Sequence, residues 1–156
     1  MCNVLDIAKY VVYKHWKDGV PITNLRLQKL LYYIQGYALR KCNEVAYSES
    51  IYRWPYGPVV TEVYFEYNIF RAKAISQPDD EEINRILKRL KKDQAIFSVI
   101  NYVVEKAYSF TAAQLVEKTH QETPWKSTND SEIISCSVIA MYFSNHSPLE
   151  CEDIAS

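Results

Sequence analysis

The segment Pro55-Tyr56-Gly57-Pro58 is the strongest local constraint on how this chain can fold. Proline fixes φ, and glycine alone tolerates positive φ without strain, so the segment predicts a tight corner with little conformational freedom. The neighbouring Trp54 and the central Tyr56 must either pack beside this corner or be presented by it. A rigid corner that carries aromatic side chains favours recognition of a partner over catalysis.

Apolar residues spaced three and four apart predict helices on both sides of the corner. Asn3 can cap a first helix that ends near Asp18-Gly19, and Thr23 can cap a second. A third helix is expected to begin at Pro58, because proline suits the first turn. Further helices are expected near residues 79–90, 96–107, 111–120 and 134–143, with an extra turn beginning at Pro124.

The predicted fold is therefore mainly α-helical: a compact single domain of about seven helices over residues 1–146, with minimal strand content. Residues 50–54 could be extended, but no partner strand is evident, and residues 147–156 are expected to form a frayed tail. The core should join the second and fifth helices, which carry the two strongest apolar stripes. Those stripes are Leu27, Leu30, Leu31 and Ile34, and Ile96, Ile100, Val103 and Val104.

Gly36 lies inside the second helix, where glycine costs up to about 1 kcal/mol relative to alanine. A close approach of another part of the backbone would compensate for this cost, and the corner at residues 55–58 is the expected neighbour. Tyr33 and Tyr37 lie beside the apolar stripe of the same helix, four residues apart and therefore adjacent on its surface.

The composition is that of an ordinary globular domain, with 48% apolar and 24% charged residues among 156. Tyrosine is unusual: there are thirteen, ten of them before Phe70. Tyrosine combines apolar area with a polar tip, so these residues can form the rim of a core or a binding face. The net charge of −1 provides no overall field that would attract nucleic acid.

Several site classes are disfavoured by the spacing of residues. Cys2, Cys42, Cys136 and Cys151 are scattered without the paired spacing of a zinc site, so neither a metal nor another cofactor is expected. The apolar run at 96–104 is too short to span a bilayer. Met1 leads directly into a helix cap, with no secretory leader, which favours the cytoplasm and free thiols.

Four sequence motifs occur in a characteristic order. They are the helix at 27–37 (LQKLLYYIQGY), the corner at 54–60 (WPYGPVV), the segment at 119–125 (THQETPW) and the helix start at 134–143. In this order the chain resembles the Panacea domain family, which holds SocA-like antitoxins and phage-associated GepA-type proteins. The resemblance implies an interaction protein, most often an antitoxin that binds its toxin directly; at least one member instead delivers its toxin to a protease.

The candidate partner-binding residues are aromatic and histidine side chains of these motifs. The prolines and the glycine of the corner have a structural role. The binding candidates are Tyr33, Tyr37, Trp54, Tyr56, His120 and Trp125, and the structural residues are Pro55, Gly57 and Pro58. A buried role with satisfied polar groups is the alternative for His120, Trp54 and Trp125.

Two other functions are weighed against binding of a protein partner, such as a toxin encoded nearby. A nucleic-acid-binding regulator of a mobile element would need a basic recognition helix, and the second helix offers only Arg26, Lys29 and Arg40. A hydrolase could use His120 as a general base beside Glu122, but no motif supplies a nucleophile or an oxyanion donor. We therefore expect a binding protein that is not an enzyme.

Overall fold

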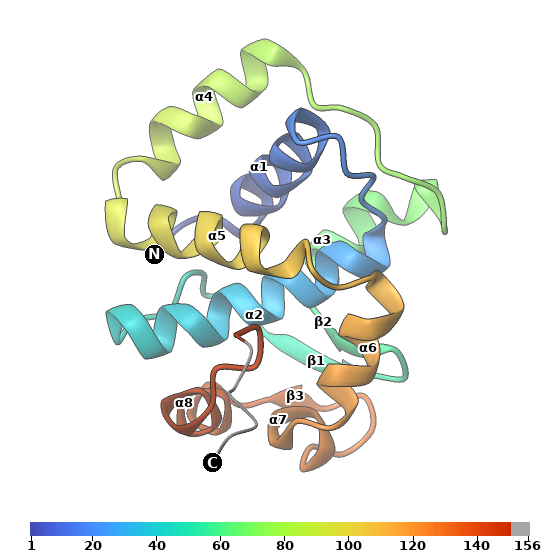
Figure 1. The fold of residues 1–156 in the computed structure, drawn as a ribbon, viewed down its shortest axis with the longest axis vertical. Helices are drawn as coiled ribbons and strands as arrows, with labels where there is room; N and C mark the ends of the chain where they lie inside the picture. The colour runs from blue at the N-terminus through green and yellow to red at the C-terminus, as the bar shows by residue number, and fades with distance from the viewer. Residues whose placement is uncertain (151–156) are drawn as a thin grey trace.

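The computed structural model describes residues 1–150, which form a mainly helical domain with a small antiparallel sheet (Figure 1). The fold class predicted from the sequence is confirmed. In chain order the elements are α1 (Val4–Lys17), α2 (Asn24–Cys42), β1 (Ile51–Trp54), β2 (Gly57–Val59), α3 (Thr61–Tyr67), the 3-10 helix η1 (Asn68–Phe70), α4 (Asp80–Leu90), α5 (Gln94–Ala107), α6 (Ala112–His120), α7 (Thr123–Lys126), β3 (Ile133–Ile134) and α8 (Cys136–Asn145).

Helix α2 is the central element of the domain. In Figure 1 it runs between α1, α4 and α5 on one side and the sheet, α7 and α8 on the other. Every residue from Arg26 to Ala38 is buried, including the polar ones. A helix surrounded in this way must satisfy its polar side chains inside the protein, because buried polar groups without partners are costly.

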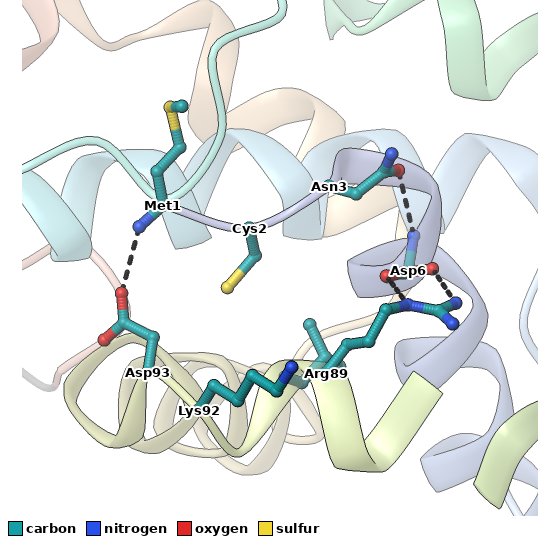
Figure 2. A pocket seen from close by; sticks show the side chains of 8 residues that line it. Met1, Cys2, Asn3, Asp6, Arg89, Lys92 and Asp93 are labelled. Carbon is teal, nitrogen blue, oxygen red and sulfur yellow. Dashed lines mark hydrogen bonds and ion pairs between the residues drawn. The ribbon is translucent and has the colours of Figure 1, made fainter. Parts of the chain in front are cut away.

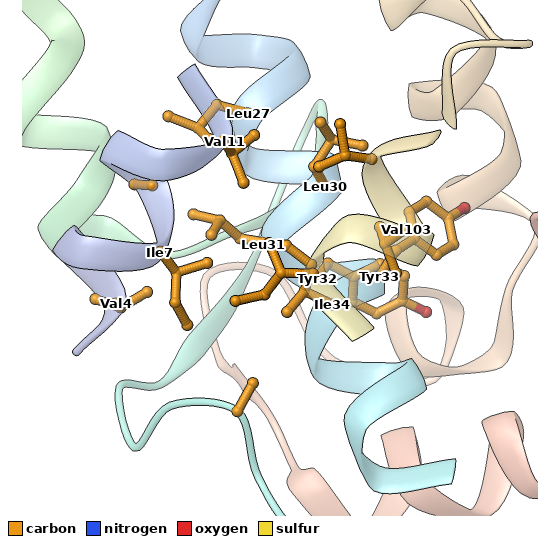
Figure 3. Packing of buried hydrophobic residues seen from close by; sticks show 14 of the residues in the cluster. Val4, Ile7, Val11, Leu27, Leu30, Leu31, Tyr32, Tyr33, Ile34 and Val103 are labelled. Carbon is orange, nitrogen blue, oxygen red and sulfur yellow. The ribbon is translucent and has the colours of Figure 1, made fainter. Parts of the chain in front are cut away.

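The main core forms where α1, α2 and α5 meet, as Figure 3 shows. Leu31 is fully buried there, beside Ile7 of α1 and Ile34 of its own helix. Val103 brings the stripe of α5 to the same cluster. The predicted pairing of the second and fifth helices is thus confirmed.

The predicted helix starts are correct at three caps and wrong at one. The side chains of Asn3 and Thr23 accept backbone N–H groups at the starts of α1 and α2, and Thr111 with Gln114 forms a capping box at α6. Helix α3 begins at Thr61, whereas the sequence predicted Pro58. Pro58 instead lies in β2, an outer strand of the sheet, where a residue without an N–H is tolerated.

The extended segment before the corner has two partner strands that sequence analysis did not find. β1 pairs with β2 through a two-residue turn, with Trp54 opposite Gly57, and its other edge pairs with β3, with Ile51 opposite Ile134. The partner strands contain three and two residues, so neither is long enough to show an alternating pattern.

A side chain of α8 occupies the space next to Gly36. The prediction that the corner at residues 55–58 approaches Gly36 is wrong. A Cβ atom at this position would lie 2.3 Å from two ring carbons of Phe143. Phe143 is fully buried and meets the rings of Tyr32 and Tyr37 edge to face. The ring therefore has little room to move away, and only glycine allows α8 to approach α2 so closely.

The segment after α8 returns to the core. Leu149 is buried, and its N–H donates to the hydroxyl of Tyr37 at 3.0 Å. The predicted frayed tail is therefore wrong for residues 147–150, because one apolar side chain and one backbone hydrogen bond fix it. The remainder of the predicted tail, residues 151–156, lies outside the described residues.

Candidate functional site

The β1–β2 hairpin is fixed to α2 by side chains of that helix. Lys29 donates from Nζ to the carbonyl of Pro58 at 2.9 Å, and the Gln28 side-chain oxygen accepts the N–H of Val60 at 2.9 Å. Gly57 has a φ of 108°, and a Cβ there would lie 2.8 Å from Thr119 Oγ1 and 2.9 Å from Lys29 Cε. Glycine is therefore required both by the backbone conformation and by the closeness of α2 and α6.

The outer side of the hairpin is fixed by α7. Trp125 donates from its indole Nε1 to the carbonyl of Trp54 at 2.9 Å. The guanidinium of Arg53 lies 3.9 Å from the centre of the Trp125 ring, and the His120 ring lies 4.2 Å from it. Trp125 thus contacts both the hairpin and the end of α6. These contacts hold the THQETPW motif at residues 119–125 next to the corner.

Glu122 connects the same motif, residues 119–125, to α2. Its carboxylate accepts the hydroxyls of Tyr32 at 2.9 Å and Tyr33 at 2.8 Å. Burial raises the pKa of Glu122 to about 7, and the two phenols act in the opposite direction. Three of the four sequence motifs that carry the resemblance therefore meet around one layer of buried hydrogen bonds, which holds the hairpin in a single orientation.

Lys29 is the least expected member of this layer. Its side chain is fully buried, and desolvation lowers its pKa to about 7. Among residues 1–150, the only hydrogen-bond acceptor of its ammonium group is the carbonyl of Pro58. An ammonium group with a single neutral acceptor in the interior is unusual, because buried charges are normally paired.

A pocket of about 490 Å³, here called the corner pocket, opens beside the tip of the hairpin. Trp54 and Tyr56 form its hairpin wall, Leu25 and Lys29 border it from α2, and Tyr64 borders it from α3. The ring of Trp54 meets that of Tyr64 edge to face at 4.9 Å. A concave aromatic surface of this size fits a side chain of a partner or a small ligand.

The tip of the hairpin projects from this pocket into solvent. Tyr56 is 70% exposed, although it lies in a turn between two residues that are paired in the sheet. Phe65 is 62% exposed and contacts the ring of Tyr64, and Ile69 on η1 is 80% exposed. Exposed Tyr56 thus lines the pocket, and exposed Phe65 and Ile69 lie on α3 and η1. These two elements supply Tyr64 and Asn68 to the lining of the pocket. Exposed apolar side chains of this kind are typical of protein-binding surfaces.

Only two of the six binding candidates named from the sequence line the corner pocket, namely Trp54 and Tyr56. Tyr33 and Tyr37 are fully buried, with their hydroxyls bonded inside the domain, so neither is on the surface of this structure. Half-buried His120 and Trp125 stack on each other behind the hairpin.

The α3 side of the pocket was missed by sequence analysis. The signal that could have found it is the short helix at 61–67, in which Val63 and Tyr67 face the core while Tyr64 and Phe65 are also large and apolar. A short surface helix with apolar residues on more than one face has a face left for a partner.

A second pocket, of about 450 Å³, lies between the N-terminal segment and the α4–α5 connection (Figure 2). Four of its charged groups form two pairs: the N-terminal amine with Asp93 at 3.0 Å, and Arg89 with both carboxylate oxygens of Asp6 at 2.8 Å. Burial raises the pKa of the Cys2 thiol, which makes the thiolate less available. Lys92 is the one charged side chain of the described lining that makes no ion pair with a described residue, and the pocket holds no activated nucleophile.

Two of the three basic residues counted for a recognition helix point into the protein. Arg26 and Lys29 are buried, and Arg26 donates to His15 and to the carbonyls of Ala107 and Phe110. Arg40 donates to the carbonyl of Phe143 at 2.6 Å. Across residues 1–150, no helix combines the length and the apolar character needed to cross a bilayer.

The fold and the site define a small helical domain whose buried polar layer presents a rigid aromatic hairpin. The family model described as "Antitoxin SocA-like, Panacea domain" matches residues 27–126, about two thirds of the chain. The chain therefore belongs to this family of SocA-like Panacea domains. Comparisons with curated proteins and with solved structures gave no significant match.

Proposed function

We propose that this protein is an antitoxin that binds its cognate toxin directly, with the corner pocket and the hairpin tip as part of the binding surface. The observation that carries the proposal is Tyr56, a large aromatic side chain that is 70% exposed on a turn fixed from both sides. Pre-ordering such a turn reduces the entropy lost on docking, and exposed tyrosines are frequent anchors of interfaces. Membership of an antitoxin family supports a protein as the partner.

Binding, and not catalysis, is the activity that we propose. His120, the best candidate for a general base, stacks on Trp125, and its Nε2 has no hydrogen-bond partner among residues 1–150. No described side chain is therefore hydrogen-bonded to this nitrogen in the way that a general base activates a nucleophile. Neutralisation within the complex and delivery of the toxin to a protease both begin with binding, and the half-life of the toxin in cells separates these two routes.

Replacing Tyr56 with alanine should weaken binding of the toxin by more than about 1 kcal/mol and leave the melting temperature nearly unchanged. The reason is that the exposed ring contributes contact area to the complex but little to the core. The measurement is the dissociation constant for the product of the neighbouring gene, beside a thermal melt of each variant. Met141→Ala on α8 is the matched control, because Met141 is 71% exposed and does not line the corner pocket.

Two results would contradict the proposed surface. Unaltered toxin binding by folded Tyr56→Ala would remove the hairpin tip from the interface. An equal loss of binding in Met141→Ala would show that any exposed apolar residue matters, and the corner would then have no special role.

A further inference from the structure

Apart from tyrosine, the ionisable side chains that line the corner pocket are all of one sign. Its described lining contains two such side chains, both basic: exposed Arg71, and Lys29, which is fully buried and has a lowered pKa. No described carboxylate lines it, although Glu62 and Glu66 lie on the adjacent helix α3. An aromatic pocket whose ionisable lining groups, tyrosine apart, are all basic is complementary to a ligand that combines an apolar group with an anion.

Lys29 strengthens this asymmetry from the buried side. The side chain has no exposed surface, and no described carboxylate lies within ion-pair distance of its ammonium group. One of its three N–H groups is used by the carbonyl of Pro58, which leaves two without an acceptor among residues 1–150. The protein therefore places a donor-rich group beside the pocket without supplying a counter-charge of its own.

Arg71 provides the second basic group of the pocket lining. It follows η1 directly and is exposed, and its guanidinium makes no ion pair with a described residue. Guanidinium groups bind carboxylates through two parallel hydrogen bonds, and an unpaired one at the edge of an apolar pocket is available for that geometry.

We propose that the corner pocket binds an acidic segment of the protein partner, in which an apolar or aromatic side chain enters the pocket and a neighbouring carboxylate pairs with Arg71. This inference rests on the proposed function, because it assigns the chemistry of the segment that the antitoxin surface receives. The apolar side chain contacts Trp54 and Tyr64, while the carboxylate meets the positive side of the pocket. Charge complementarity of this kind gives specificity and speeds association.

The test uses three acetylated and amidated peptides of identical length, Gly-Glu-Phe-Glu-Gly, Gly-Gln-Phe-Gln-Gly and Gly-Lys-Phe-Lys-Gly. Each is titrated into the folded full-length protein, and backbone amide shifts of residues 54–72 are followed by NMR. The acidic peptide should bind at least about tenfold more tightly than the glutamine peptide, which corresponds to about 1.4 kcal/mol. The lysine peptide should bind most weakly of the three.

Arg71→Glu should abolish the preference for the acidic peptide. Lys73→Glu is the matched control, because Lys73 is exposed on the same segment and carries the same charge but does not line the pocket. That variant should keep most of the preference.

Equal affinities for the acidic and glutamine peptides, or a preference that survives Arg71→Glu, would overturn the assignment of an acidic segment. Failure of all three peptides to shift residues 54–72 at millimolar concentration would overturn it as well. Either result leaves the proposed antitoxin function standing, because loss of toxin binding in Tyr56→Ala tests that function separately and without reference to charge.

Discussion

Replacing Leu31 with alanine should lower the free energy of unfolding by about 2–5 kcal/mol. Leu31 is fully buried where α1, α2 and α5 meet, so the truncation removes apolar contacts on several sides and leaves a cavity (Figure 3). Because α2 is enclosed by other elements, the surroundings can collapse only partly into the space. Urea denaturation of the wild-type protein and the variant measures the difference.

Leu25 provides a matched control on the same helix. It is 39% exposed and borders the corner pocket, so Leu25→Ala should change the free energy of unfolding by no more than about 0.5 kcal/mol. The same variant should weaken toxin binding, which Leu31→Ala should affect only through unfolding. Similar stabilities of the two variants would contradict the description of α2 as the buried centre of the fold.

Raising the pH above 7 should stabilise the wild-type protein relative to Lys29→Met. Desolvation lowers the folded-state pKa of Lys29 to about 7 from its ordinary value of 10.5. Between these values the unfolded chain binds more protons than the folded one, so the contribution of Lys29 to stability rises with pH. The rise can reach about 1.4 kcal/mol per pH unit within this window, and below it the cost of burying the charge is fully present.

The comparison is made by urea denaturation of both proteins at about pH 7.5 and about pH 9.5, a range within the expected window. Thiols such as Cys2 also titrate with rising pH, but they do so in both proteins, so the difference between the two isolates Lys29. Methionine keeps an unbranched side chain of similar length, although it loses the hydrogen bond to Pro58. The same pH dependence in both proteins would mean that Lys29 is not held in a desolvated site.

The helices of this protein could be predicted because each has a local signal. Asn3, Thr23 and the Thr111–Gln114 pair cap their helices as expected, and the apolar stripes of α2 and α5 identified the core. The rigid corner could also be predicted from its local sequence, since Gly57 has the positive φ that its neighbours suggested.

The errors arose where distant segments decide the structure. Tyr33 was expected on a binding face, because nothing in its own helix indicates that Glu122 accepts its hydroxyl from 89 residues away. Gly36 was assigned to the corner, whereas Phe143 of α8 fills the space above it. Such pairings depend on how α6, α7 and α8 close over α2, and no periodicity within a single helix reports that.

The site was predicted in part. Trp54 and Tyr56 were identified from the prolines and the glycine around them, and both line the corner pocket. The α3 side of the pocket, with Tyr64 and Arg71, could not be placed, because it depends on where α3 turns after β2. The burial of Lys29 was also hidden, since lysine in a helix is ordinarily on the surface.

The most direct test of the central claim is hydrogen exchange of the protein alone and in complex with the neighbouring gene product that arrests growth when expressed by itself. Our account predicts that binding slows exchange at residues 54–59 and 64–72, which carry the hairpin tip and the α3 side of the corner pocket. Exchange in α4 and on the exposed side of α8 should stay unchanged. Protection confined to those two helices, with none at the hairpin, would contradict the account.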